Sequence, residues 1–295
     1  MLTVGYIGLG IMGKSIARNI MRSGFPVVVH NRSRAAVQEL VAEGAGEAFS
    51  PSEVTARSDV VFTNLPDSPD VEAVVLGPGG IMEKARKGQV YIDNSTIKPA
   101  TARLISAKLG GRGMQALDAP VSGGDVGARN ATLTVMVGGE ADALEKVMPV
   151  LKVMGKTITH VGGAGAGQVA KAANQIMVAA QMVAMGELLV FSQKSGVDPR
   201  KVVSAIKDGA AQCWALDVKP PRLFSGNRDP GFKAYMQAKD MSIVLETARE
   251  YGVPLPGTAA NTQLFNAMLQ MNMAELDNSA VIGVIEALAG EKLAV

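Results

Sequence analysis

The feature that most constrains this chain is a glycine pattern at its start, between an apolar run and a helical stretch. Residues 4–7 have the composition of a buried strand, and residues 14–23 have the spacing of a helix. Glycines in the order G-x-G-x-x-G stand between them. There the first glycine permits a tight turn, the second a close approach to a pyrophosphate, and the third close packing of a helix whose N-terminus faces the phosphates. The pattern predicts a dinucleotide-binding turn formed by Gly8, Gly10, Ile11, Met12 and Gly13.

Short β-branched runs alternate with helical stretches through the first half of the chain. This alternation is typical of βαβ units and a mainly parallel sheet. The predicted strands are residues 4–7, 27–30, 59–64, 90–93, 115–118, 132–137 and 157–161. The first half is therefore predicted to be an α/β Rossmann domain covering residues 1–162.

The second half has a different pattern. Residues 168–194 are rich in Ala, Met, Val and Leu and predict one long helix, apolar on most faces and buried between domains or subunits. Prolines break the rest into further helical pieces with little strand signal. Residues 163–295 are therefore predicted to form an all-α domain for substrate binding and oligomerisation, as a homodimer or homotetramer.

Composition excludes several classes of protein. The content of 47% hydrophobic and 19% charged residues is that of a soluble globular protein, and the apolar stretches are expected to fall short of a bilayer span. A net charge of +2 makes nucleic acid an unfavourable partner. One cysteine, Cys213, and two histidines leave no disulfide and no metal site to expect. The N-terminal segment lacks the pattern of a signal peptide, so we expect a cytoplasmic protein, and we expect Trp214 in the core.

The residues after the second predicted strand bear on the choice of dinucleotide. Asn31 stands where NAD enzymes of this fold carry an acidic residue for the ribose 2′-hydroxyl, and Arg32 and Ser33 follow it. No carboxylate here repels a 2′-phosphate, and a guanidinium can pair with one. The sequence therefore favours NADPH and leaves NADH possible. The alternative is that Arg32 is only a solvated loop charge.

Several motifs resemble those of the β-hydroxyacid dehydrogenase family, in the same order and spacing from end to end. They are GLGIMG at 8–13, DAPVSGG at 118–124, GAGQVAKAANQ at 165–175 and, more weakly, KD at 239–240. The resemblance implies a nicotinamide-dependent oxidoreductase with a Rossmann domain followed by a helical domain.

The family resemblance gives Lys171 the role of general acid and base. Asn174 and Gln175 follow it at i+3 and i+4, on the same face of the predicted helix. A lysine ammonium can donate a proton to a carbonyl oxygen as hydride arrives at carbon. Neither histidine lies in a motif. Without the family, a solvated surface lysine is the alternative.

The turn at Ser122, Gly123 and Gly124 is the predicted site for the substrate carboxylate. A hydroxyl and bare backbone N–H groups after a strand can gather around an anion, although the same three residues alone also fit an ordinary tight turn. The resemblance implies that Phe232 lines the substrate pocket and that Asp240 lies close to the catalytic lysine. It also implies cofactor contacts for Leu65, Pro66, Thr96 and Lys239.

Within the family, the motifs look most similar to the tartronate semialdehyde reductases, which favours reduction of tartronate semialdehyde to glycerate. The segment 31–33 is more similar to glyoxylate and succinic semialdehyde reductases. These activities, and 3-hydroxyisobutyrate dehydrogenase, stay open, because one methylene is worth only about 1–3 kcal/mol of discrimination. A non-catalytic dinucleotide-binding module is the alternative from another class, and the lysine at 171 speaks against it. It also speaks against an imine reductase, while the chain length speaks against a phosphogluconate dehydrogenase.

Overall fold

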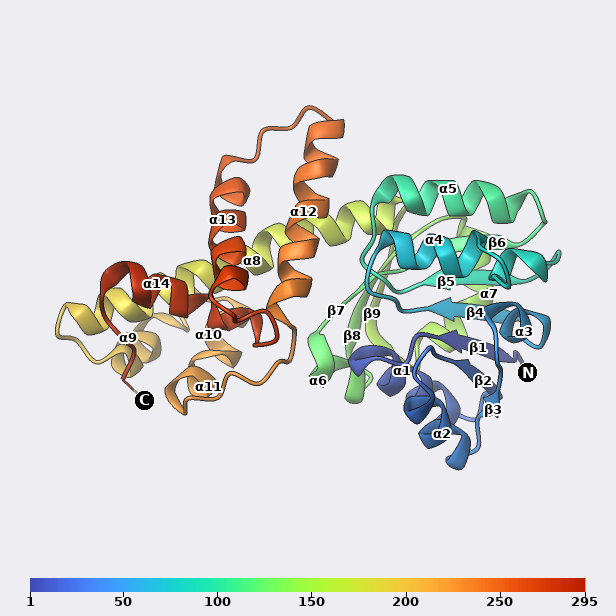
Figure 1. The fold of residues 1–295 in the computed structure, drawn as a ribbon, viewed down its shortest axis with the longest axis horizontal. Coiled ribbons are helices and arrows are strands. Elements are labelled where there is room, and N and C mark those ends of the chain that lie inside the picture. Colours follow the sequence, from blue (N-terminus) through green and yellow to red (C-terminus); the bar gives the residue numbers. More distant parts are fainter. Residues whose placement is uncertain (295) are drawn as a thin grey trace. The chain divides into compact units, whose positions relative to one another are not determined.

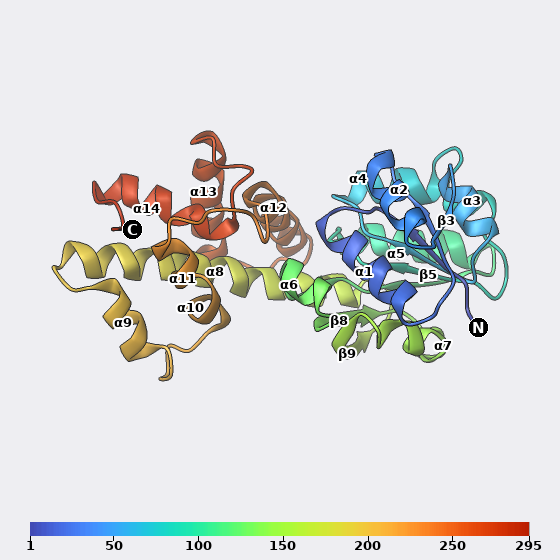
Figure 2. The ribbon, with the colours of Figure 1, turned by 90° about the horizontal axis from the view of Figure 1, so that it is seen from below.

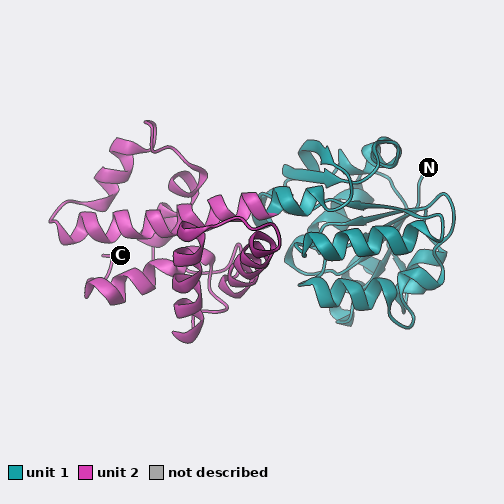
Figure 3. Cartoon of the chain, turned by 90° about the horizontal axis from the view of Figure 1, so that it is seen from above, with its two compact units in different colours: residues 1–171 teal, residues 172–295 magenta. Residues whose placement is uncertain are grey.

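The computed structural model describes residues 1–294, which divide into two compact units, one of residues 1–171 and one that begins at Ala172 (Figure 3). The division falls inside helix α8 (Ala166–Lys194), which begins in the first unit and continues into the second. The domain boundary predicted at 162/163 precedes this helix and stays a prediction.

The first unit is built on a nine-stranded sheet with the order β3-β2-β1-β4-β5-β6-β8-β7, in which β9 pairs with β8 (Figures 1 and 2). Strands β1 to β6 run parallel, whereas β8 is antiparallel to β6 and β7. The order from β3 to β6 is that of a dinucleotide-binding Rossmann sheet. The strands are β1 (Val4–Ile7), β2 (Val27–His30), β3 (Gly46–Glu47), β4 (Val60–Thr63), β5 (Val90–Asp93), β6 (Gln115–Asp118), β7 (Val121–Ser122), β8 (Leu133–Gly138) and β9 (Gly155–Gly162).

The register of the parallel strands brings their carboxyl ends to one edge of the sheet. Ile7 pairs with His30 on one side and with Thr63 on the other. Thr63 in turn pairs with Asp93, and Asp93 with Asp118. The turns that follow these strands therefore start side by side, at the edge where open α/β sheets bind ligands.

Apolar helix faces cover both sides of this sheet. In α1, for example, Ile16, Ala17 and Ile20 are buried at helical spacing, and they join a core with the strands beneath them. The helices on this side are α1 (Ile11–Arg22), α2 (Arg34–Ala42), α6 (Gly124–Arg129) and α7 (Ala141–Leu151). Those on the other side are α3 (Pro51–Ala56), α4 (Ser68–Leu76), η1 (Ile81–Glu83) and α5 (Pro99–Gly110).

The second unit is helical, as predicted. The apolar side chains of α8, among them Met182 and Leu189, pack against Met241 and Phe265 in a core of their own. The remaining helices are α9 (Pro199–Ile206), α10 (Trp214–Val218), α11 (Pro220–Phe224), α12 (Ala234–Glu250), α13 (Pro256–Gln270), η2 (Asn278–Val281) and α14 (Ile282–Ala289).

Two expectations from the sequence need correction. The apolar stretches were expected to fall short of a bilayer span, but helix α8 is long and apolar enough to cross a membrane by length and composition alone. Half of its most apolar 18-residue stretch is buried inside the protein, as in a core helix. Trp214 is not in the core, because its side chain at the start of α10 is 49% exposed. The two-residue strands β3 and β7 were not predicted, since so short a segment carries no periodicity.

Candidate active site

The glycine turn after β1 leaves the N-terminus of α1 open. Gly8 has φ +96°, and a Cβ there would lie 2.3 Å from the carbonyl oxygen of Asn64. A Cβ on Gly13 would lie 2.0 Å from the carbonyl oxygen of Gly8, so the third glycine lets the helix pack against the turn. Gly10 is the N-cap residue, provides no side-chain cap, and has no atom within 4 Å of a Cβ position. The backbone N–H groups of this turn fit the pyrophosphate of a dinucleotide, which would lie against Ile11 and Met12.

Asn31, directly after β2, also supports the glycine turn. Its Oδ1 accepts a hydrogen bond from the backbone N–H of Leu9 at 3.0 Å, and its Nδ2 donates to the carbonyl oxygen of Ser33 at 3.0 Å. Arg32 and Ser33 are exposed beside it. The residue predicted to bear on cofactor choice is therefore held by two hydrogen bonds, with an exposed guanidinium as its neighbour.

Buried polar groups join the loops that follow β4 and β5. The backbone N–H of Leu65 donates to Ser95 Oγ at 2.8 Å, and the N–H of Ser95 donates to Asp93 Oδ1 at 3.0 Å. Burial raises the pKa of Asp93 to about 6, although hydrogen bonds from Ser95 and Thr63 oppose the rise. These contacts fix the two loops that carry the predicted cofactor residues Leu65, Pro66 and Thr96.

Asp118, the last residue of β6, holds the start of helix α8. Its Oδ1 accepts from the N–H of Gly165 at 2.7 Å, and its Oδ2 accepts from the N–H of Gln168 at 2.8 Å. Burial raises the pKa of this carboxyl, while these hydrogen bonds act in the opposite direction. The side chain of Gln168 continues the connection, since it donates to the carbonyl oxygen of Ser95 and accepts from the N–H of Ile97, at 2.8 and 3.1 Å.

Lys171 lies one helical turn beyond Gln168 and is only 7% exposed. Its Nζ donates to the carbonyl oxygen of Val121 at 2.8 Å. Val121 directly precedes the predicted carboxylate turn, in which Gly123 has φ +129° and Gly124 φ +63°. The first unit therefore brings the lysine ammonium to the backbone that leads into Ser122–Gly124.

The other predicted residues belong to the second unit. The Nε2 of Gln175 donates to Asp240 Oδ2 at 2.5 Å, and Nδ2 of Asn174 donates to Gln175 Oε1 at 2.8 Å. Lys239 Nζ lies 2.7 Å from Asp240 Oδ1. These four residues form one polar group, whereas Phe232 stands half-buried in the loop before α12.

Sequence reasoning did not assign a role to Asp93, Ser95, Asp118 or Gln168. Asp118 and Gln168 lie inside the motifs. A polar residue at the end of an apolar strand is the signal that could have identified Asp93 and Asp118. Their hydrogen-bond partners lie as many as 73 positions away along the chain, so the pattern alone did not connect them.

Comparisons with known proteins identify the family of this chain. Residues 3–162 match the family model described as the NAD binding domain of 6-phosphogluconate dehydrogenase. Residues 165–285 match the model described as NAD-binding of NADP-dependent 3-hydroxyisobutyrate dehydrogenase. The chain is 39% identical to 2-hydroxy-3-oxopropionate reductase of Escherichia coli (strain K12), over 99% of this chain and 100% of that protein. It belongs to the β-hydroxyacid dehydrogenase family. The resemblance inferred from the motifs is thereby confirmed.

Other members are also similar over the whole length. An NAD-dependent L-serine dehydrogenase of Pseudomonas aeruginosa is 35% identical over 99% of this chain and 100% of that protein. The structure of Mycobacterium tuberculosis 3-hydroxyisobutyrate dehydrogenase with L-serine has a TM-score of 0.88 at 32% identity, covering 97% of this chain and 99% of that one. This family member is therefore an NAD(P)-dependent oxidoreductase of CH–OH groups with the predicted Rossmann and helical parts. Its relatives differ in substrate.

Proposed function

We propose that the protein reduces a small semialdehyde that carries a carboxylate, with tartronate semialdehyde to glycerate as the favoured reaction. The observation that carries the proposal is the buried ammonium of Lys171, held 2.8 Å from the Val121 carbonyl oxygen at the start of the Ser-Gly-Gly turn. A buried charge beside an anion-binding turn suits a carbonyl substrate that has a carboxylate at its other end.

Lys171 acts as the general acid in this proposal. When bound, the dinucleotide would supply the hydride. As a new C–H bond forms at the carbonyl carbon, the π electrons move to the carbonyl oxygen, which takes a proton from Lys171 Nζ. In the reverse direction the neutral amine accepts the hydroxyl proton. The hydrogen bond to the carbonyl oxygen of Val121 keeps Nζ oriented, because that oxygen can only accept.

The turn at Ser122–Gly124 is the proposed carboxylate site. Positive φ angles at Gly123 and Gly124 allow successive backbone N–H groups to point toward one anion. No atom lies within 4 Å of the Cβ position on Gly124. Asn174, Gln175, Asp240 and Phe232 are the proposed substrate residues of the second unit. Lys239 is proposed to contact the cofactor.

NADPH is the proposed preferred cofactor, with NADH possible. The support is local: Asn31 is neutral, and exposed Arg32 can pair with a 2′-phosphate. Thr96 is proposed to lie near the nicotinamide ribose, and Leu65 and Pro66 are proposed to belong to the loop that covers the cofactor.

The test follows oxidation of NADPH and of NADH with tartronate semialdehyde, glyoxylate, succinic semialdehyde and methylmalonate semialdehyde. In the reverse direction it follows reduction of NADP+ and of NAD+ with L-serine. Lys171→Met should lower kcat by a factor of about 10² to 10⁴ while NADPH still binds. Lys84→Met, at an exposed lysine after η1, is the matched control. Turnover retained by Lys171→Met refutes the role of the lysine. Cofactor binding by the wild type without turnover of any substrate supports the non-catalytic module instead.

We also propose a homodimer or homotetramer formed through the second unit. Phe191 near the end of α8 and Leu288 in α14 are 73% and 75% exposed, and a partner subunit would cover such large apolar side chains. Sedimentation velocity tests this proposal, since a monomer at micromolar concentration contradicts it. The expected cytoplasmic location is tested by cell fractionation.

A further inference from the structure

A lysine and an aspartate form a buried ion pair inside the helical unit. Lys219 Nζ lies 2.7 Å from Asp277 Oδ1, and the two side chains are 4% and 2% exposed. Lys219 stands at the junction of α10 and α11, and Asp277 is the N-cap residue of η2. Such a pair adds little net stability, because the cost of removing two charges from water offsets their attraction. The contribution of this pair to the protein therefore depends on what else the carboxylate binds.

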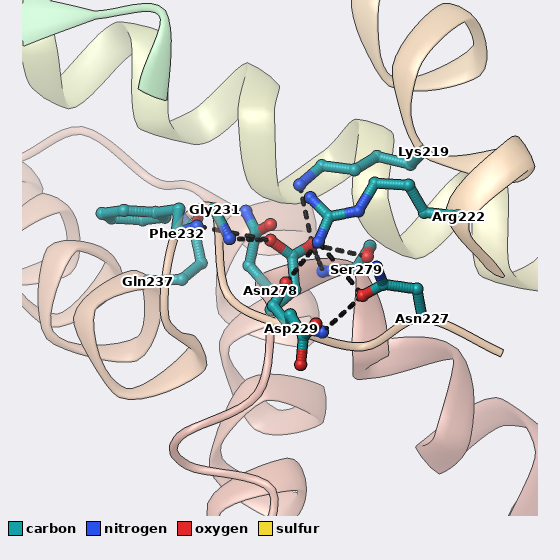
Figure 4. A network of polar contacts seen from close by, with 10 residues as sticks. Lys219, Arg222, Asn227, Asp229, Gly231, Phe232, Gln237, Asn278 and Ser279 are labelled. Carbon is teal, nitrogen blue, oxygen red and sulfur yellow. Dashed lines mark hydrogen bonds and ion pairs between the residues drawn. The ribbon is translucent and has the colours of Figure 1, made fainter. Parts of the chain in front are cut away.

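The Asp277 carboxylate also holds the loop that carries Phe232. Its Oδ2 accepts from the backbone N–H groups of Gly231 and Phe232, at 2.9 and 3.3 Å (Figure 4). Its Oδ1 accepts from the N–H and the hydroxyl of Ser279, at 3.1 and 2.6 Å, in addition to the lysine. The lysine charge and the loop backbone thus meet on one carboxylate.

The backbone at Asp277 and Asn278 holds the segment around Phe232 as well. The carbonyl oxygen of Phe232 accepts from the N–H of Asn278 at 2.8 Å, and the N–H of Asp277 donates to the carbonyl oxygen of Arg228 at 3.0 Å. Lys233 and Asp277 form an isolated antiparallel bridge. The backbone of Phe232 is therefore fixed at both its N–H and its carbonyl group, in a loop without regular secondary structure of its own.

Only an ionised carboxylate can accept from all these donors. Burial by itself raises the pKa of Asp277, but the Lys219 ammonium and the hydrogen bonds from Lys219 and Ser279 outweigh burial and hold the pKa below its usual range. A neutral amide at this position would turn an N–H group toward some of the same donors. The lysine thus keeps the carboxylate in the form that the loop requires.

We propose that Lys219 and Asp277 are positioning residues that fix the ring of Phe232 and thereby set selectivity among semialdehydes of different length. The inference depends on the proposed function, which places Phe232 in the wall of the substrate pocket. Neither residue contacts the substrate in this scheme. They act through the loop backbone, so that releasing the loop widens the range of substrates accepted.

The first variant is Lys219→Met, which removes the ammonium and keeps much of the side-chain volume. The KM for the preferred semialdehyde should rise about tenfold, and the kcat/KM ratio between three- and four-carbon semialdehydes should shrink by a similar factor. The Kd for NADPH should stay unchanged, and kcat at saturating substrate should change less than KM. Lys233→Met is the matched control, because it removes a surface ion pair with Glu275 from the same loop.

Lys219→Met leaves a buried carboxylate without its counter-charge and can prevent folding. The double variant Lys219→Met with Asp277→Asn removes both charges and serves as the second test, with the same change in selectivity expected. A folded variant of either kind that keeps the KM and the selectivity of the wild type overturns the proposal. Trp214, whose ring centroid lies 5.5 Å from Lys219 Nζ, reports by its fluorescence whether this region has folded.

Amide hydrogen exchange gives a measurement that does not depend on turnover. The amides of Gly231 and Phe232 should exchange faster in both variants than in the wild type, while amides in the core of α12 keep their protection. Unchanged exchange at these two amides overturns the positioning role. A wild type that turns over none of the semialdehydes refutes the proposed function, whereas faster exchange in the variants still supports the hold on the loop.

Discussion

Asp93 should make the stability of the first unit depend on pH in a way that one substitution removes. Burial raises its pKa from 3.8 to about 6. Because the folded state binds this proton more tightly than the unfolded chain, the stabilisation is complete below about pH 4 and is lost as pH rises through about 6. At about 1.4 kcal/mol for each pH unit between the two pKa values, the loss of unfolding free energy amounts to about 3 kcal/mol.

The variant Asp93→Asn removes this titration with little change of shape. An amide oxygen in the place of Oδ1 can still accept from Thr63 Oγ1 and from the N–H of Ser95, at 2.8 and 3.0 Å. Oδ2 has no hydrogen-bond partner among the described residues, so the amide nitrogen replaces no existing contact. Relative to the wild type, the variant should gain about 3 kcal/mol in unfolding free energy between about pH 4 and about pH 8.

Urea unfolding followed by far-ultraviolet circular dichroism at the two pH values measures this difference. Asp277→Asn is a control of opposite sign. Burial raises the pKa of Asp277, but Lys219 and the hydrogen bonds from Ser279 together outweigh burial and hold the pKa below its usual range. The stabilisation from Asp277 is present at neutral pH and is lost as pH falls, so its replacement should cost more at high pH. A free-energy difference between Asp93→Asn and wild type that stays constant with pH would refute the reasoning.

Four further substitutions test the site. Gly10→Ala should leave the unfolding free energy within about 0.5 kcal/mol, because nothing lies within 4 Å of its Cβ, yet weaken NADPH binding about tenfold. Gly13→Ala should lower both the unfolding free energy and the affinity for NADPH, since its Cβ would lie 2.0 Å from a carbonyl oxygen. Equal effects of Gly10→Ala and Gly13→Ala on unfolding in calorimetry and on NADPH binding in titration would contradict this. Asp118→Asn should cost about 1.5–3 kcal/mol and lower kcat, because one N–H at the start of α8 loses its acceptor, and unchanged urea midpoints would argue against that role. Asn31→Asp should shift kcat/KM toward NADH by about tenfold through repulsion of a 2′-phosphate, and an unaltered cofactor ratio would remove the support for NADPH.

The sequence alone determined the Rossmann and helical parts and the family. Short β-branched runs and the glycine spacing are local signals, so the strands from β1 to β9 were predicted wherever they exceed two residues. Lys171 and the Ser122–Gly124 turn could be named because each lies in a motif whose residues are close together along the chain.

Only the tertiary structure decided what holds those residues in place. Asp118 reaches Gly165 across 47 positions, and Lys219 reaches Asp277 across 58. Trp214 was expected in the core, yet at the start of the short helix α10 it is 49% exposed. Burial and hydrogen-bond partners depend on which distant segments pack together, and periodicity measures only neighbours along the chain.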